Sequence, residues 1–535
     1  MTYIANSLRG SRAMAVAPHS LAAQSALAAM REGGNAVEAM IAAAATIAVV
    51  YPHMNSIGGD GFWLISRPGH APIALDACGA SAFGASLQGY REQNLLQIPF
   101  RGGLAANTVA GTLSGWAAAD LWQRQTLQGR LPLSRLLDDA VQYARRGIPV
   151  TASQHRCTQA KREELAGVTG FAETFLLDGS TPAVGQRFCQ PRLADTLERL
   201  GRVGIADFYT GELARSISAD LQAAGSPLRL EDLQQHRAQW RQPLSLEHSR
   251  GTVYNFPPPT QGLVSLLILG QLDRLLEDTM DPCGAPFVHA CVESTKRAFA
   301  IRDRHITDPA YMIIDPQSLL SAESLQSMTA AHDPAIAAPW GKGVGPADTV
   351  WMGCVDEQGV AVSFIQSLYH EFGSGIVLPQ SGVNWQNRGC SFSLDPQALN
   401  PLTPHRKPFH TLNPALAQLS DGRTLVYGNM GGDGQPQSQS AVFSRIVNFA
   451  MNPQAAIDAP RWLLGRTWGA ASDNLKLEGR FSSECVAALR GLGHEIELFA
   501  DYDETMGHAG AIVRHADGLL EGGFDPRSDG AVAGW

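Results

Sequence analysis

Charged residues are scarce in this 535-residue chain, and those of one sign form no cluster. Asp, Glu, Lys and Arg make up 17% of the residues, the formal net charge is −9, and no lysine- or arginine-rich run is present. Nucleic acids and anionic membranes attract clustered positive charge, so we expect neither as a partner. The hydrophobic fraction of 44% is that of a globular protein with a large buried core.

The chain also lacks long apolar runs and a cysteine framework. The longest apolar stretch, 39–51, is too short to span a bilayer, and no apolar segment follows Arg9 and Arg12 as a secretory signal requires. The eight cysteines form no C-x-x-C pair and no cysteine–histidine cluster with zinc spacing. We therefore expect a cytoplasmic protein with free thiols, no metal and no cofactor.

Hydrophobic periodicity predicts a mostly helical first part and a β-rich second part. The helices expected from apolar spacing and capping residues are 20–30, 36–50, 133–145, 192–200 and 261–275. Alternating β-formers predict a hairpin at 349–355 and 360–368, a strand at 424–427, and further hairpins from 494–499, 510–514 and 519–523. The pattern indicates an α/β protein.

Thr349 opens the first predicted hairpin, directly after the Gly/Pro-rich segment 342–348. Its hydroxyl could attack the carbonyl of Asp348, and hydrolysis of the resulting ester would leave Thr349 with a free α-amine. Such an amine has a pKa near ~8, suitable for a general base, so one residue would supply both nucleophile and base. A threonine at the start of a strand after a loop is also commonplace, and spacing alone favours this second interpretation.

Several blocks of sequence resemble the γ-glutamyltransferase superfamily. They occur in the family order and span almost the whole chain, at residues 33–39 and 58–62, 348–349 with 355–359, 372–377 with 381–383, 428–432, and 525–530. The resemblance implies a four-layer αββα sandwich of the N-terminal-nucleophile hydrolase type. It also implies self-cleavage after Asp348 into a large subunit, 1–348, and a small subunit, 349–535, which stay associated as one folded unit. A dimer of such units is a further expectation.

The resemblance assigns catalytic roles to four residues. Thr349 aligns with the nucleophile, and Ser367 falls where the family has a threonine whose hydroxyl assists it. Gly431 and Gly432 align with the oxyanion hole, where backbone N–H groups stabilise developing negative charge.

The residues that hold a γ-glutamyl substrate in this family are mostly replaced here. The family's carboxylate-binding arginine is Cys78, and the other replaced positions hold Tyr369, Arg388, Ser391, His410 and Thr411. The segment 391–408, where the family carries a lid, looks short, so we expect an open site that favours hydrolysis over transfer to an amine. Arg388 is suited to bind a carboxylate, although a surface salt bridge is the commoner role of an arginine. Cys78 is equally well explained as a small core residue.

These replacements predict an amidohydrolase for a small anionic amide. Within the superfamily the pattern is most similar to the members that convert oxamate to oxalate and ammonia, here through an acyl-Thr349 intermediate. A γ-glutamyltransferase or glutathione hydrolase and a glutaryl-type acylase are the enzymatic alternatives. A non-catalytic relative is the alternative from another class.

Overall fold

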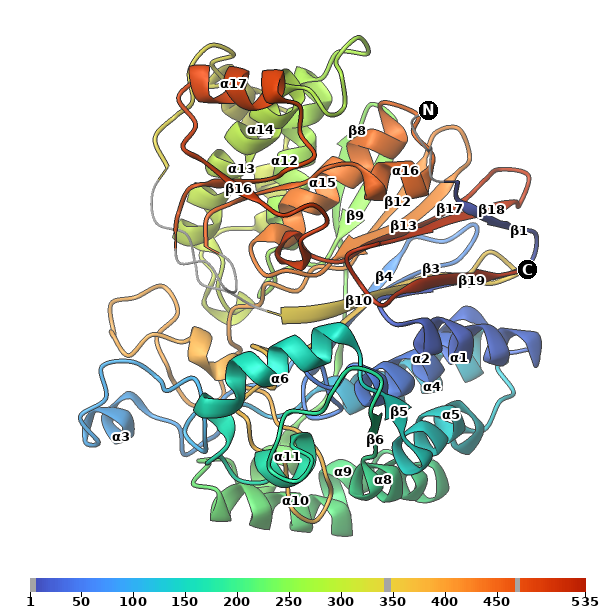
Figure 1. Ribbon diagram of the computed structural model, residues 1–535, viewed down its shortest axis with the longest axis vertical. Helices are drawn as coiled ribbons and strands as arrows, with labels where there is room; N and C mark the ends of the chain where they lie inside the picture. Colours follow the sequence, from blue (N-terminus) through green and yellow to red (C-terminus); the bar gives the residue numbers. More distant parts are fainter. Residues whose placement is uncertain (1–5, 341–347, 467–471) are drawn as a thin grey trace.

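Two seven-stranded antiparallel sheets lie face to face between two layers of helices, as seen in the computed structural model (Figure 1). The structure describes residues 6–340, 348–466 and 472–535. The first sheet has the order β1 (Leu8–Gly10), β18 (Leu520–Phe524), β17 (Ala509–Arg514), β13 (Thr424–Asn429), β12 (Ala415–Leu419), β9 (Gly251–Asn255) and β8 (Leu244–His248). The second has the order β19 (Ala531–Gly534), β2 (Met14–Ala17), β10 (Asp348–Val355), β11 (Ala361–Tyr369), β3 (Asp60–Ser66), β4 (Ile73–Ala77) and β7 (Gln239–Arg241). The predicted four-layer αββα fold is confirmed.

The facing surfaces of the two sheets form a thin apolar core. Trp351 of β10 crosses this core and packs against Gly428 and Gly510 of the first sheet. A Cβ atom at Gly428 would lie 2.1 Å from the indole, and one at Gly510 would lie 2.4 Å from it. Glycine is therefore required at both positions for the sheets to approach each other.

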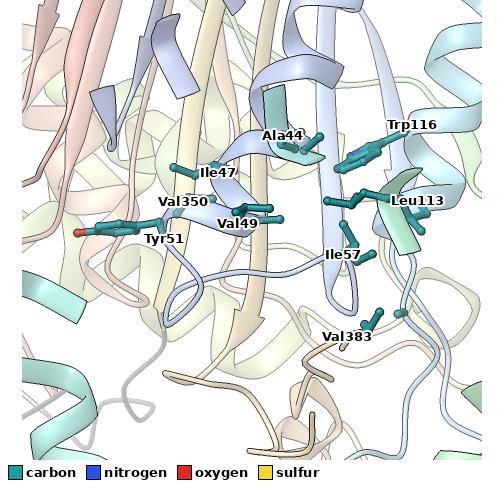
Figure 2. Close-up of a cluster of buried hydrophobic side chains, with 14 of the residues drawn as sticks. Ala44, Ile47, Val49, Tyr51, Ile57, Leu113, Trp116, Val350 and Val383 are labelled. Atoms are coloured by element: carbon teal, nitrogen blue, oxygen red, sulfur yellow. The ribbon is translucent and has the colours of Figure 1, made fainter. Parts of the chain in front are cut away.

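Helix α2 (Ala36–Val50) is buried along its whole length between the second sheet and the helices outside it. Asn35 and Glu38 form a capping box at its N-terminus, which fixes its start at the predicted residue. Figure 2 shows Ile47 and Val49 of α2 beside Val350 of β10, in the core cluster that contains all three. The helix thus supports the strand that begins with the candidate nucleophile.

The remaining helices divide between the two outer layers. The second sheet is covered by α1 (Ser20–Arg31), α2, α4 (Thr112–Thr126) and α5 (Leu133–Arg146), and the first by α12 (Gly262–Leu275), α13 (Ala285–His305), α15 (Gly434–Val447) and α16 (Pro453–Asp458). The other helices are α3 (Leu87–Arg91), α6 (Ala152–Leu165), α7 (Phe171–Phe175), α8 (Pro191–Val203), α9 (Asp207–Thr210), α10 (Glu212–Ala223), α11 (Leu230–Gln235), α14 (Ala322–Ala330) and α17 (Ser483–Gly491). Among the described residues, no helix has both the length and the apolarity needed to cross a membrane.

One predicted hairpin strand is wrong. The segment 494–499 contains β16 (Ile496–Phe499), which pairs in parallel with β15 (Leu475–Glu478) in a small sheet completed by β14 (Trp462–Leu464). Parallel pairing needs a crossover, here α17, so β16 is not a hairpin partner of β17. The hairpin of β17 and β18 is confirmed. The remaining strands, β5 (Ile148–Pro149) and β6 (Arg187–Phe188), pair with each other.

Both large sheets combine strands from either side of residue 349. The second sheet places β10, β11 and β19 among β2, β3, β4 and β7, while β12, β13, β17 and β18 of the first sheet lie between β1 and β9. The description of residues 1–348 as mostly helical therefore understates their contribution to the sheets. Neither part of the chain forms a complete sheet without the other.

Candidate active site

Thr349 and Ser367 lie side by side on adjacent central strands of the second sheet. The register of β10 and β11 is irregular between Asp348 and Val350, and the Thr349 Oγ1 lies 3.5 Å from the Ser367 Oγ. The Ser367 Oγ accepts a hydrogen bond of 2.8 Å from the backbone N–H of Tyr369. Thr349 is fully buried. The segment 342–347, which contains most of the predicted processing linker, lies outside the described residues.

Gly431 and Gly432 form a tight turn between β13 and the N-terminus of α15. Their φ angles are +117° and +52°, a backbone region that favours glycine. Among the hydrogen bonds of the described residues, neither N–H donates, whereas the Gly432 carbonyl accepts a bond of 2.8 Å from the Gln261 Nε2. The positive end of α15 adds to these two N–H groups, so the turn has the chemistry of an anion-binding site.

Gln435, in the first turn of α15, connects this turn to the candidate nucleophile. Its Nε2 lies 3.4 Å from the Thr349 Oγ1, and its Oε1 accepts a bond of 3.1 Å from the Asn413 Nδ2. Sequence reasoning missed this residue, although it stands only three positions after Gly432. The contact joins the helix of one layer to a strand of the opposite sheet, and no local pattern reveals such a pairing.

Arg388 is buried, with 1% of its surface exposed, which excludes a surface salt bridge. Its guanidinium carbon lies 3.9 Å from the centre of the Tyr369 ring, a cation–π arrangement. None of its three guanidinium nitrogens has a hydrogen-bond partner within the described part of the chain. Burial lowers the pKa of Arg388 to about 10, but the side chain stays cationic at neutral pH.

The backbone holds Arg388 and Tyr369 next to each other. The N–H of Asn387 donates to the Leu368 carbonyl over 3.1 Å, and Tyr369 itself has a positive φ of 87°. The backbone N–H of Tyr369 also donates to Ser367, so three contacts, through Tyr369 and Ser367, connect the cation to Thr349. Burial raises the pKa of the Tyr369 hydroxyl to about 12, and the group is neutral at neutral pH.

Asp60, Cys78 and His410 form a buried group, and the charge of Arg388 acts on both Asp60 and His410. Asp60 pairs with Ser367 in the sheet register, and its Oδ2 lies 3.4 Å from the His410 Nε2. Burial raises the pKa of Asp60 to about 7 and that of Cys78 well above its ordinary value. Burial, together with the charges of Arg388 and Lys407, holds the pKa of His410 well below its ordinary value, so the imidazole is neutral. Asp60 was missed by sequence reasoning, although it lies in the glycine turn 58–61.

The two other predicted substrate residues also present polar atoms without partners. The Thr411 Oγ1 and the Ser391 Oγ are buried and, among the described residues, accept and donate no hydrogen bond. The Thr411 carbonyl accepts from Gln261 over 2.8 Å, which holds this segment against the turn at Gly432. Several unpaired polar atoms on the predicted substrate residues are unusual in a protein interior and are typical of a ligand site.

The expectation of an open site is wrong for the chain as described. Thr349, Arg388 and His410 are each at most 1% exposed. A cavity of about 590 Å³ has Cys78 and Lys407 in its wall. Cys78 is therefore both a core residue and part of the wall of this cavity.

Comparison with known proteins identifies the family. The profile described as Gamma-glutamyltranspeptidase matches residues 22–535. The chain belongs to this family. It is 59% identical to the oxamate amidohydrolase proenzyme of Klebsiella pneumoniae over 98% of each chain, and 39% identical to a glutathione hydrolase-like proenzyme of Bacillus subtilis over 99% of each. A solved cephalosporin acylase from Bacillus halodurans superposes with a TM-score of 0.91 at 32% identity, covering 100% of this chain and 98% of that one.

Family membership confirms the predicted enzyme class, an N-terminal-nucleophile hydrolase. The roles of the individual site residues and the cleavage after Asp348 stay predictions. The geometry gives each role a physical setting: a hydroxyl pair, two backbone N–H groups at a helix N-terminus, and a buried cation.

Proposed function

We propose that this family member cleaves itself after Asp348 and hydrolyses oxamate to oxalate and ammonia. The observation that carries the proposal is the buried Arg388 guanidinium, whose nitrogens have no hydrogen-bond partner among the described residues. A buried cation without such a partner favours an anionic ligand. The 59% identity to the oxamate amidohydrolase proenzyme of Klebsiella pneumoniae supports the same substrate.

The proposed reaction uses Thr349 as nucleophile and base. Its α-amine takes the hydroxyl proton, and Oγ1 attacks the amide carbonyl, while the N–H groups of Gly431 and Gly432 bind the oxyanion. The C–N bond breaks, the amine's proton passes to the leaving nitrogen, and ammonia departs from an oxalyl ester. The amine then deprotonates a water molecule, which cleaves the ester and restores the Thr349 hydroxyl. Ser367 and Gln435 position the nucleophile oxygen from two sides.

The buried setting supports a very small substrate. The carboxylate of oxamate is bonded directly to the scissile carbonyl, so the group that binds it must lie close to Thr349. The chain of contacts from Arg388 through Tyr369 and Ser367 to Thr349 supports Arg388 in this role. We expect hydrolysis over transpeptidation, because the buried Thr349 leaves more room for a water molecule than for a peptide acceptor. The cytoplasmic location and the dimer of two-subunit units remain predictions.

An acylase for longer anionic amides is the second candidate. The cavity of about 590 Å³ beyond Cys78 would accommodate an extended acyl group, and Lys407 in its wall offers a second cation. The likeness to the Bacillus halodurans cephalosporin acylase supports this alternative.

Intact mass and substrate assays test the proposal together. Wild-type protein should give two fragments, the smaller beginning at Thr349, while Thr349→Ala should give one chain. Ammonia release from oxamate is then compared with cleavage of a γ-glutamyl anilide and of a glutaryl amide. Faster turnover of either comparator would assign the enzyme to that substrate, and an uncut, inactive wild type would favour a non-catalytic protein.

A further inference from the structure

Asp60, Cys78 and His410 bring a carboxylate, a thiol and an imidazole together from three separate segments. Asp60 begins β3, Cys78 follows β4, and His410 precedes β12. One potential ligand atom from each lies within 4.8 Å of the other two, and all three side chains are buried. Carboxylate, thiolate and imidazole are the ligands that zinc takes in proteins.

The spacing within this group suits tetrahedral coordination. The Asp60 Oδ2 and the His410 Nε2 are 3.4 Å apart. Two such ligands, each about 2.0–2.1 Å from a tetrahedral zinc ion, are separated by about 3.4 Å. The Cys78 sulfur belongs at a slightly longer distance of about 3.6 Å from each, because Zn–S bonds measure about 2.3 Å.

The ligand atoms are also available for bonding. Among the described residues, neither ring nitrogen of His410 has a hydrogen-bond partner, and neither does the Asp60 Oδ2. The Cys78 thiol makes one weak contact, 3.7 Å from the Gly79 carbonyl. Buried polar atoms are normally satisfied, so this concentration of unpaired atoms requires an explanation.

Asp60 is held in the orientation that a ligand needs. Its other oxygen, Oδ1, accepts hydrogen bonds from the backbone N–H groups of Gly79 and Gly111, at 2.9 and 3.1 Å, and from the Gln386 Nε2 at 3.1 Å. These bonds direct Oδ2 toward His410. Fixed ligand orientation of this kind strengthens metal binding.

We propose that Asp60, Cys78 and His410 bind one zinc ion, which reversibly inhibits the enzyme. Binding releases the Cys78 proton and, in molecules where Asp60 is protonated, the Asp60 proton, and the thiolate and the Asp60 carboxylate then balance the two charges of zinc. Arg388 then faces a neutral cluster in place of a second cation. The ion enters from the cavity whose wall contains Cys78, and the thiol proton leaves by the same route.

Inhibition follows from where the ion sits. Asp60 and His410 are both near enough to Arg388 for its charge to lower their pKa values, so an ion held by them takes up space beside the carboxylate that Arg388 binds. This part of the inference rests on the proposed function, whereas zinc binding does not. Zinc here is an inhibitor and takes no part in the reaction of Thr349.

The binding test uses cobalt(II) as a spectroscopic substitute for zinc in the purified full-length protein, under reducing conditions. One equivalent of cobalt should give a near-ultraviolet thiolate-to-cobalt charge-transfer band, and zinc should abolish it. Cys78→Ser should lose the band, whereas Cys390→Ser should retain it. Cys390 is the matched control because it is another thiol near Arg388 but lies outside the group.

A second group of potential ligands cannot produce the same signal. His289, Glu293 and His494 contain no thiol, and two of them are hydrogen-bonded to each other at 2.8 Å. Absence of a band in the wild type, or its persistence in Cys78→Ser, would overturn the site. Cys78→Ala provides a second variant if serine disturbs folding, which a thermal melt reveals. Asp60→Asn should raise the Kd for zinc at least tenfold, because the variant lacks one carboxylate ligand.

The inhibition test measures oxamate hydrolysis against zinc concentration, with each variant compared to its own zinc-free rate. Cys78→Ser should need at least tenfold more zinc than wild type for half-inhibition, and Cys390→Ser should match wild type. A charge-transfer band without inhibition would refute the inhibitory role alone. If oxamate is no substrate, the proposed function fails, while the cobalt result still decides the metal site.

Discussion

Replacing Arg388 by methionine should stabilise the protein and inactivate it at the same time. Methionine has similar length and no charge, so the change removes the cation from its buried site while filling most of its volume. Burial lowers the pKa of Arg388 from 12.5 to about 10. At about 1.4 kcal/mol per pKa unit, the buried charge costs on the order of 3 kcal/mol of folding free energy.

The sign and size of the stability change follow from this value. Below pH 10 the arginine is charged in both the folded and the unfolded chain, so the penalty is present in full at pH 7. Stacking on Tyr369 returns roughly 1 kcal/mol, which leaves a net gain of about 2 kcal/mol for Arg388→Met. With an unfolding entropy of about 2.1 cal/mol/K per residue, the Tm of the whole chain should rise by roughly 2 °C.

Activity should move in the opposite direction. Loss of one partner of a buried ion pair removes about 3–5 kcal/mol, so kcat/KM for oxamate should fall by about two to four orders of magnitude. Thermal melts and ammonia-release kinetics measure the two effects. Arg388→Lys is the control, since it keeps the charge but not the bidentate fork, and should lose activity without gaining stability. A methionine variant with a lower Tm, or with unchanged kcat/KM, would refute the reasoning.

Three further predictions concern Asp60, Ser367 and Gln435. Burial raises the pKa of Asp60 to about 7, so its ionisation destabilises the fold fully above pH 7 and not at all below about pH 4. The Tm of Asp60→Asn should therefore rise relative to that of wild type as the pH increases from about 4 to 7, as thermal melts would show. A Tm difference that does not change with pH would contradict the raised pKa of Asp60. In steady-state assays, Gln435→Leu should lower kcat by about tenfold to a hundredfold with little change in KM, because Gln435 contacts the nucleophile oxygen. A rise in KM alone would place Gln435 in substrate binding. Ser367→Ala should slow both chain cleavage, measured by intact mass, and turnover, measured by ammonia release. Ser367→Thr should restore both rates, because it keeps a hydroxyl. An equal loss in both variants would show that the hydroxyl does not assist Thr349.

Local signals predicted the elements whose ends are fixed by neighbouring residues. Helix α2 begins and ends where expected because Asn35 caps it and Pro52 follows it. Strand β16 was assigned the wrong partner because its pairing with β15 depends on a crossover helix, which alternation of apolar residues does not encode. The order of strands within the two sheets was equally beyond local reasoning.

The candidate site divides in a similar way. Thr349 and Ser367 were predicted from family resemblance, and the hairpin of β10 and β11 brings them together. Gln435 and Asp60 were missed because their contacts cross between layers of the fold. The burial of Arg388 was missed because it depends on how distant parts of the chain pack, and a polar residue gives no sign of burial in the sequence.

The interleaving of strands from both sides of residue 349 has a consequence for refolding. Before cleavage, every strand pair in both sheets forms within one molecule, so the precursor should refold at a rate independent of protein concentration. After the proposed cleavage, the same sheets require two separate chains to meet, and each chain alone exposes unpaired strand edges. The denatured mature enzyme should therefore refold in a bimolecular, concentration-dependent reaction that competes with aggregation. Self-cleavage would thus make assembly irreversible in practice: the enzyme folds once, as a precursor, and its two chains would not exchange with those of another molecule.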